Sequence, residues 1–178
     1  MSREAIQVSA SLNASRKPIP FRSVNRRGSS GYDPGFQRHH LLPRQLLNRR
    51  CFGRFFRALD YRSVGFHDFR ANGLLLPANE EATLRVGMPL HRGPHRAYNE
   101  VVMERVGRIE EHWSRARLSD QETALRDALD RLGWLQGALR RRLLDERRRM
   151  RLNRKDPLGT GFDFSELDAM AEMLWAST

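Results

Sequence analysis

The chain has 178 residues, enough for one domain with a hydrophobic core or for a small domain with a helical extension. Lysine and arginine number 32 against 21 acidic residues, and the resulting net charge of +11 indicates a polyanionic partner. A single cysteine excludes internal disulfides and cysteine-based zinc sites, and no apolar run approaches the length of a membrane span.

The positive charge is carried almost entirely by arginine, because Lys17 and Lys155 are the two lysines. Arginine presents a planar group that matches phosphate; a GC-rich genome also favours arginine, but it does not explain the net charge. All 32 basic residues precede position 156 and five of the 21 acidic residues follow position 155, so residues 1–155 carry +16 and residues 156–178 carry −5. We expect an acidic tail that is a solvated helix, or that folds back on the basic body or binds a partner.

The first thirty residues are rich in Ser, Arg, Asn and Pro, which predicts a disordered basic arm over residues 1–30. Residues 1–20 lack the continuous apolar stretch of a secretory signal. We therefore expect a cytoplasmic protein, or one exported without a cleaved signal.

A strand and a helical segment are predicted next. After the turn signal Tyr32-Asp33-Pro34-Gly35, residues 36–42 predict a short strand. Pro43 suits the first position of a helix, and the apolar spacing predicts helix up to about Leu59, although Gly53 weakens it.

The strongest hairpin-turn signal in the chain is Ala71-Asn72-Gly73. It follows residues 64–69, which predict a loop or short strand, and precedes Leu74-Leu75-Leu76, which predicts a buried strand ended by Pro77. Residues 78–89 are rich in turn-forming residues and are predicted as loop.

Three helices are predicted in the second half of the chain. The first covers about Arg92 to Val106. The second begins at the capping box Ser119-Asp120-Gln121-Glu122 and continues to about Leu144 with apolar residues at spacings of three and four. A short amphipathic helix is predicted over residues 165–175.

Four of the six histidines form two pairs. His39 and His40 are adjacent on the predicted strand, so their rings point to opposite faces and one can hold a metal while the other faces a substrate. His91 and His95 are four residues apart, which places them on one face of a helix where they can bind one ion together. Three imidazoles with an open coordination position are typical of a catalytic metal site, and a fourth beside it is placed to be a general base. These residues indicate a one-metal hydrolase, and the charge indicates a nucleic acid as its substrate.

A second interpretation is a zinc-stabilised module that binds nucleic acid or protein without cutting it. It requires a closed fourth coordination position, for which His67 is the candidate, and it has no need of His40. His67 also suits a loop histidine paired with Asp68.

The segments "RHHLLP", "DFRANGLLLP" and "LHRGPHRAYNEVV", within residues 36–106, resemble the AHH nucleases of the HNH/endonuclease VII superfamily. The order of their histidines and Asn72 is also similar to that of the colicin DNases. The resemblance implies an α+β fold with a small ββα-metal core of two short antiparallel strands, embedded in additional helices. We expect the nuclease core over residues 31–112 and a helical C-terminal extension with an acidic tail over residues 113–178.

The resemblance also implies roles for individual residues. His39, His91 and His95 would hold one divalent metal ion, which three histidines leave open as Zn, Mg, Mn or Ni. His40 would be the general base. Asn72, through its side chain or its backbone carbonyl, would fix the ring of His40.

Three arginines near these histidines are candidates for contact with a substrate phosphate: Arg38, Arg92 and Arg96. Arg38 stands where the AHH family has the small residue of its name, so it either pairs with the phosphate or points away. The helix over residues 119–144 has an apolar stripe longer than a small core needs, which predicts packing on the core or on a second copy. Its arginine-rich end, residues 140–151, is predicted to extend the positive surface.

The activity implied is divalent-metal-dependent hydrolysis of phosphodiester bonds, with DNA favoured over RNA as the substrate. A toxin effector nuclease whose immunity protein covers the basic groove is a further alternative. It would share the chemistry and differ in biological role.

Overall fold

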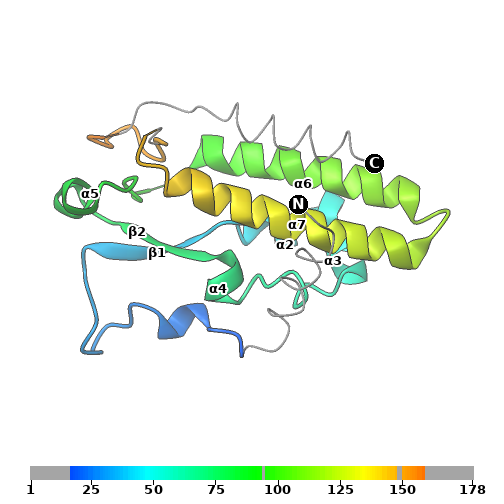
Figure 1. The fold of residues 1–178 in the computed structure, drawn as a ribbon, viewed down its shortest axis with the longest axis horizontal. Helices are drawn as coiled ribbons and strands as arrows, with labels where there is room; N and C mark the ends of the chain where they lie inside the picture. Colours follow the sequence, from blue (N-terminus) through cyan, green and yellow to red (C-terminus); the bar gives the residue numbers. More distant parts are fainter. Residues whose placement is uncertain (1–16, 94, 148–149, 159–178) are drawn as a thin grey trace.

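A computed structural model describes residues 17–93, 95–147 and 150–158 (Figure 1). Two short strands, β1 (Phe36–His40) and β2 (Gly73–Pro77), form one antiparallel sheet. Helices precede, separate and follow the strands, so the predicted α+β fold with a small ββα-type core is confirmed. With η marking a 3-10 helix, they are η1 (Phe21–Ser23), α2 (Gln45–Asn48), η2 (Arg50–Phe52), α3 (Gly53–Ala58), α4 (Phe69–Asn72), α5 (Glu80–Val86), α6 (Arg96–Ala116) and α7 (Gln121–Leu143).

The hairpin turn predicted at residues 71–73 is wrong. β1 pairs with β2 in a register that sets His40 opposite Gly73, while α2, η2, α3 and α4 lie between the two strands in the chain. Asn72 is the last residue of α4, and Gly73 has an ordinary negative φ of −113°. Glycine is needed there for space, because a Cβ atom would lie 2.2 Å from the ring of Phe69. The Asn-Gly signal therefore marks a close contact between α4 and β2.

The helical segment predicted from Pro43 to Leu59 is divided into α2, η2 and α3. Arg49, which joins the first two, has an extended backbone with φ −78° and ψ 124°, and this conformation interrupts the helix. The pieces still bury their apolar side chains in the core. These are Leu46, Phe52, Phe55 and Phe56.

Part of the segment predicted as loop over residues 78–89 is the helix α5, so that prediction is wrong. The side chain of Asn79 accepts the backbone N–H of Ala82 at 2.8 Å and caps the first turn. Gly87 ends the helix with a φ of 68°. Both end signals are present in the sequence, but the 7 residues between them are too few to show a helical period.

The two long helices, α6 and α7, lie side by side (Figure 1) and share one hydrophobic core with the sheet and the short helices. The N-cap of α7 is Asp120, one residue after the predicted Ser119, and its carboxylate accepts the N–H of Thr123 at 3.0 Å. The predicted apolar stripe packs on the core of its own chain. Its buried members include Ala128, Leu132, Leu135, Leu139 and Leu143.

Residues 17–30, about half of the predicted disordered arm, lie against the rest of the fold, and the prediction is wrong for them. The N–H of Ile19 donates to the carboxylate of Asp68 at 2.9 Å, and its carbonyl accepts the N–H of Phe69 at 2.7 Å. Asn25 is held by hydrogen bonds to the turn before β1. Backbone pairing of this kind stabilises a segment that has few apolar side chains of its own.

The division of the chain at residues 30 and 112 stays a prediction, although α6 continues without a break through position 112. The helix predicted over residues 165–175 and nearly all of the acidic tail lie outside the described residues. Among the residues that are described, no helix combines the length and the apolar character needed to cross a membrane.

Candidate metal centre

His39 is a buried histidine with an unpartnered ring nitrogen. Only 4% of its surface is exposed, and its Nε2 has no hydrogen-bond partner among the described residues. The ring of Tyr98, on the first turn of α6, meets it edge-on with centroids 5.0 Å apart, and the Tyr98 hydroxyl donates to the carbonyl of Leu41 at 2.8 Å. A buried polar atom without a partner costs about 1–3 kcal/mol. An ion bound at Nε2 would remove that cost.

His91 and His95 reach His39 from a loop and from a helix end. The prediction that both lie on the first turns of one helix is wrong, because α6 begins at Arg96 and His95 is its N-cap. The N–H of His91 donates to the carbonyl of Pro77 at the end of β2, at 2.6 Å. Gly93 lies between the two histidines with a φ of 78°, so the chain turns and the two rings meet with centroids 4.4 Å apart.

The structure brings together the three histidines that the sequence suggested as metal ligands. The ring centroid of His39 lies 4.9 Å from that of His91 and 5.8 Å from that of His95. One ligand nitrogen from each ring lies within 4.8 Å of the other two. Among the described residues, this is the group of histidine, cysteine and acidic side chains that could hold a metal ion.

Hydrogen bonds at the outer nitrogens determine which nitrogen faces the centre. Nδ1 of His91 lies 3.2 Å from Oε1 of Gln37, and Nδ1 of His95 lies 3.4 Å from the carbonyl oxygen of Leu152. Both partners are acceptors, so each Nδ1 carries the proton and each Nε2 keeps its lone pair. With Nε2 of His39 these make three neutral nitrogens, a set that fits a divalent metal ion with open coordination positions.

Burial keeps these rings neutral. It lowers the pKa of His39 well below the ordinary value of 6.5, and the neighbouring His91 and His95 lower it further. Burial, followed by His95, lowers the pKa of His91 to about 4. Burial also lowers the pKa of His95. Because a metal binds the neutral imidazole, the cluster at neutral pH does not have to lose protons before it binds one.

His40 projects from the other face of β1, as alternation along a strand predicts. Its ring stacks on that of Phe21, with centroids 3.8 Å apart and planes 3° apart. Burial, followed by nearby positive groups of which Arg44 is foremost, lowers the pKa of His40 to about 4. The ring is therefore neutral at pH 7 and able to accept a proton.

The role of Asn72 at the ring of His40 stays a prediction, and its hydrogen bonds in the structure are made to other groups. Its buried side chain accepts the N–H of Leu42 at 2.7 Å and donates to the Leu42 carbonyl at 3.1 Å. Its backbone carbonyl accepts the N–H of Leu41 at 2.8 Å. Nε2 of Gln136, on α7, donates to the same side-chain oxygen at 3.3 Å. Asn72 thus fixes the backbone of the chain directly after β1.

The arginines suggested as substrate contacts have different surroundings. Arg38 is exposed on β1, and its Nη1 donates to the carbonyl of Phe21 at 3.0 Å. Arg92 and Arg96 are exposed beside two of the clustered histidines. His67, the candidate for a fourth ligand, is exposed and lies outside the three-histidine group.

Three partners of these histidines were not predicted from the sequence. Gln37 could have been found, because alternation along β1 places it on the same face as His39. The carbonyl of Leu152 could not, since it is 57 residues from His95 and carries no side-chain signal. Phe21 lies in the segment predicted as disordered, so its stacking on the histidine ring of β1 was also missed.

Together, the fold and the site define a small α+β protein in which two antiparallel strands and the start of a helix surround a three-histidine centre. The sequence model of AHH, "a nuclease family of the HNH/ENDO VII superfamily with conserved AHH", matches residues 20–133. The match covers more than half of the chain, and the chain belongs to this family. It is therefore a nuclease, a hydrolase that acts on nucleic acid. No curated protein and no solved structure matches it.

An arginine replaces the alanine of the family's AHH triplet, which here is Arg38-His39-His40. An alanine could not reach beyond the strand, whereas the guanidinium of Arg38 donates to the carbonyls of Phe21 and, at 3.5 Å, Val24. The hydrogen bonds of Arg38 thus connect the N-terminal segment, residues 17–35, to the strand that carries His39 and His40.

Proposed function

We propose that this nuclease is a divalent-metal-dependent endonuclease that hydrolyses phosphodiester bonds in DNA. The observation that supports it most is the meeting of three neutral histidines beside a fourth, His40, whose ring faces away from them. A ligand set with a separate base next to it is what metal-assisted hydrolysis requires.

In this proposal His39, His91 and His95 hold one divalent ion through their Nε2 atoms. The bound ion would polarise the scissile phosphate and stabilise the charge that develops on the leaving oxygen. Three protein ligands leave room for the substrate phosphate to approach. Among Zn, Ni, Mn and Mg, an all-imidazole set favours the first two, because Mn and Mg prefer oxygen ligands.

His40 would take a proton from the attacking water. Its ring is neutral at pH 7 because its pKa is about 4, and stacking on Phe21 restricts its orientation. Since it projects from the other face of β1, it is free to act as a base instead of completing the ligand set. Asn72 supports this role as a positioning residue, through its hydrogen bonds to the backbone after β1.

We propose DNA as the substrate in preference to RNA. Proteins that recognise unpaired RNA bases use exposed aromatic rings as stacking platforms. Among the described residues, the exposed aromatic side chains Tyr32, Tyr61 and Trp134 are only 38–40% exposed and come from three separate parts of the chain. A surface with a net charge of +11, carried by arginine, favours contact with a phosphate backbone and little reading of sequence.

A plasmid-nicking assay tests this proposal. Supercoiled plasmid should become nicked in the presence of a divalent ion, EDTA should stop the reaction, and adding back Zn, Ni, Mn or Mg one at a time should identify the ion. An RNA of matched length tests the preference for DNA. Nicking that persists in EDTA, or none with any of the four ions, would contradict the proposal.

A further inference from the structure

A cleft with a volume of about 640 Å³ lies between the N-terminal segment and β1. This volume is within the range of ordinary ligand pockets, about 300–1,000 Å³. Among the residues that the structure describes, no acidic side chain lines it. Four arginines, a tyrosine and a glutamine are prominent in its lining: Arg22, Arg26, Arg27, Arg38, Tyr32 and Gln37.

The cleft and the candidate metal centre share one contact residue, Gln37. This residue lines the cleft, and its Oε1 lies 3.2 Å from Nδ1 of His91. The cleft also includes Arg38, the sequence neighbour of His39. A chain of phosphates lying in the cleft would therefore run beside the strand that carries His39.

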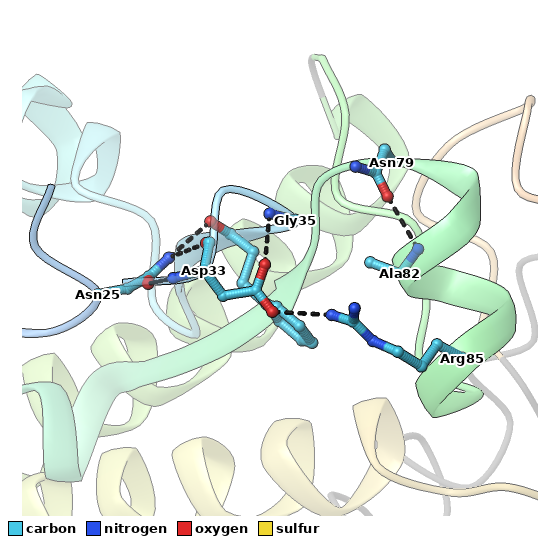
Figure 2. A network of polar contacts seen from close by, with 7 residues as sticks. Asn25, Asp33, Gly35, Asn79, Ala82 and Arg85 are labelled. Atoms are coloured by element: carbon cyan, nitrogen blue, oxygen red, sulfur yellow. Dashed lines mark hydrogen bonds and ion pairs between the residues drawn. The ribbon is translucent and has the colours of Figure 1, made fainter. Parts of the chain in front are cut away.

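The wall formed by the N-terminal segment is held in place by a network of hydrogen bonds (Figure 2). The side-chain amide of Asn25 donates to the carbonyls of Asp33 and Phe36, at 2.8 and 2.9 Å. Its oxygen accepts the N–H of Asp33 at 2.8 Å. Asn25 has a φ of 45°, a conformation that asparagine tolerates better than most residues. Because this network uses the whole amide, the wall is pre-organised and does not need a ligand to order it.

The carboxylate of Asp33 does not cancel the positive charge of this wall. Within residues 17–35, Asp33 is the single acidic residue, against Lys17 and three arginines. Its carboxylate accepts the N–H of Gly35 at 2.7 Å and forms an ion pair with Arg85 of α5 at 2.8 Å (Figure 2). The ion pair thus leaves Arg22, Arg26 and Arg27 as an excess of positive charge.

Arg38 connects the two walls. Its Nη1 donates to the carbonyl of Phe21, the residue before Arg22, at 3.0 Å. The same position is an alanine in the family's AHH triplet. In this chain, the first residue of the triplet therefore holds the arginine-rich N-terminal segment beside the strand that carries His39.

We propose that this cleft binds the sugar–phosphate backbone of the cut DNA strand, on one side of the scissile phosphate. Guanidinium groups match phosphate oxygens in shape and charge, and the lining offers no pattern that would read base edges. The proposal rests on the proposed nuclease function for the location of the scissile phosphate, but the binding itself can be measured without cleavage.

The test compares two double variants of the full chain that each remove two exposed arginines. Arg26→Ala/Arg27→Ala removes them from the cleft. Arg54→Ala/Arg57→Ala removes them from α3, which Figure 1 places away from the N-terminal segment. Both lower the net charge equally, so a difference between them reports the position of the charge. Affinity for a fluorescent DNA duplex is measured by anisotropy in EDTA, at several salt concentrations.

We expect the cleft variant to bind about ten-fold more weakly than the α3 variant at about 0.1 M salt. Its slope of log affinity against log salt should be smaller by about 2, since each phosphate contact contributes about 0.9. Arg26→Lys/Arg27→Lys should recover most of the slope. Thermal melting of each variant verifies that the fold is retained. Equal affinities and slopes for the two alanine variants would overturn the proposal.

Failure of the cleft and failure of the nuclease proposal give different results. If the wild-type protein nicks plasmid with metal but the cleft variant binds like the α3 variant, the proposal for the cleft is wrong and the nuclease proposal is retained. If the wild-type protein does not nick plasmid but the cleft variant alone loses affinity and slope, the cleft binds backbone and the proposed chemistry is wrong.

Discussion

The two faces of β1 differ in burial, charge and contacts. On one face, His39 is buried against Tyr98 and meets the other two clustered histidines, which burial keeps neutral. On the other face, Arg38 is exposed and His40 stacks on Phe21 of the N-terminal segment. A strand of five residues thus separates a centre suited to a cation from a surface suited to a polyanion.

The separation has an electrostatic reason. A metal ion and a cluster of arginines in direct contact would repel each other, and the arginines would weaken binding of the ion. With a strand between them, a phosphate at the strand could be attracted by both. The alternation of side chains along β1 therefore does more than orient two histidines, because it keeps two kinds of positive charge apart.

Replacing His39 should have the largest effect, because it is the ligand candidate on the sheet and has a fully buried ring nitrogen without a partner among the described residues. In His39→Ala we expect the affinity for Zn or Ni to fall by more than about 100-fold, beyond what loss of an outer partner costs, and nicking to disappear. Calorimetric metal titration and the plasmid assay measure the two effects. His67→Ala, at an exposed histidine outside the cluster, is the matched control and should retain both properties. Unchanged metal affinity in His39→Ala would place the ion elsewhere.

Replacing His40 should distinguish the role of its face of β1 in cleavage from the role of the other face in metal binding. Loss of a general base slows nicking by about 10²–10⁴-fold, whereas metal affinity in His40→Ala should stay within about two-fold because no ligand is removed. The same titration and nicking assays report both numbers. If His40→Ala loses metal as His39→Ala does, the two histidines act on one ion and the distinction between the faces is wrong.

Acid should destabilise the metal-free protein through the same histidines. Their pKa values are lowered in the folded state, so below the ordinary value of 6.5 the unfolded chain binds more protons than the folded one. The free energy of unfolding is therefore highest above about pH 6.5, and it decreases as the pH falls toward 4. For His91, whose pKa is about 4, the shift corresponds to on the order of 3 kcal/mol, and the less buried His40 contributes less because solvent screens it.

Thermal melting in EDTA between pH 7.5 and 4 measures this loss. The melting temperature of His40→Ala should depend less on pH, because one of the four histidines is gone. Most of the dependence should remain, because it comes from the three histidines of the metal-binding face. A melting temperature that stays constant from pH 6.5 to 4 would show that these rings are not held neutral by the fold.

The sequence predicted the site better than it predicted the elements that carry it. Adjacent histidines on a strand must diverge, so the separation of His39 from His40 followed from local geometry alone. The convergence of His91 with His95 was expected from a shared helix face, yet the two residues lie in a loop, where Gly93 has a positive φ, and at the N-cap of α6. A spacing of four fits both geometries, and only tertiary contacts such as the hydrogen bond from His91 to Pro77 decide between them.

Asn72 shows what one sequence cannot reveal. The Asn-Gly pair has the composition of a hairpin turn, but the glycine is needed for its contact with Phe69 and the asparagine for its bonds to Leu42. Both reasons depend on residues that the fold brings into contact. A composition signal identifies residues with special requirements, and it does not state which requirement applies.

The smallest effect, and the sharpest test of how the two faces are joined, comes from Gln37. It orients His91 from the metal side and lines the arginine cleft, but it is neutral. Gln37→Leu removes the acceptor for Nδ1 of His91, so the ring should populate both tautomers and metal affinity should fall by about ten-fold. DNA affinity in EDTA should change little, since no charge is lost. Gln37→Glu, which keeps an acceptor, should retain the tautomer. Nitrogen chemical shifts of the His91 ring report the tautomer directly. If Gln37→Leu keeps a single, unchanged tautomer and an unchanged metal affinity, the hydrogen bond does not orient the ligand. The two faces of β1 would then be coupled by the strand backbone alone.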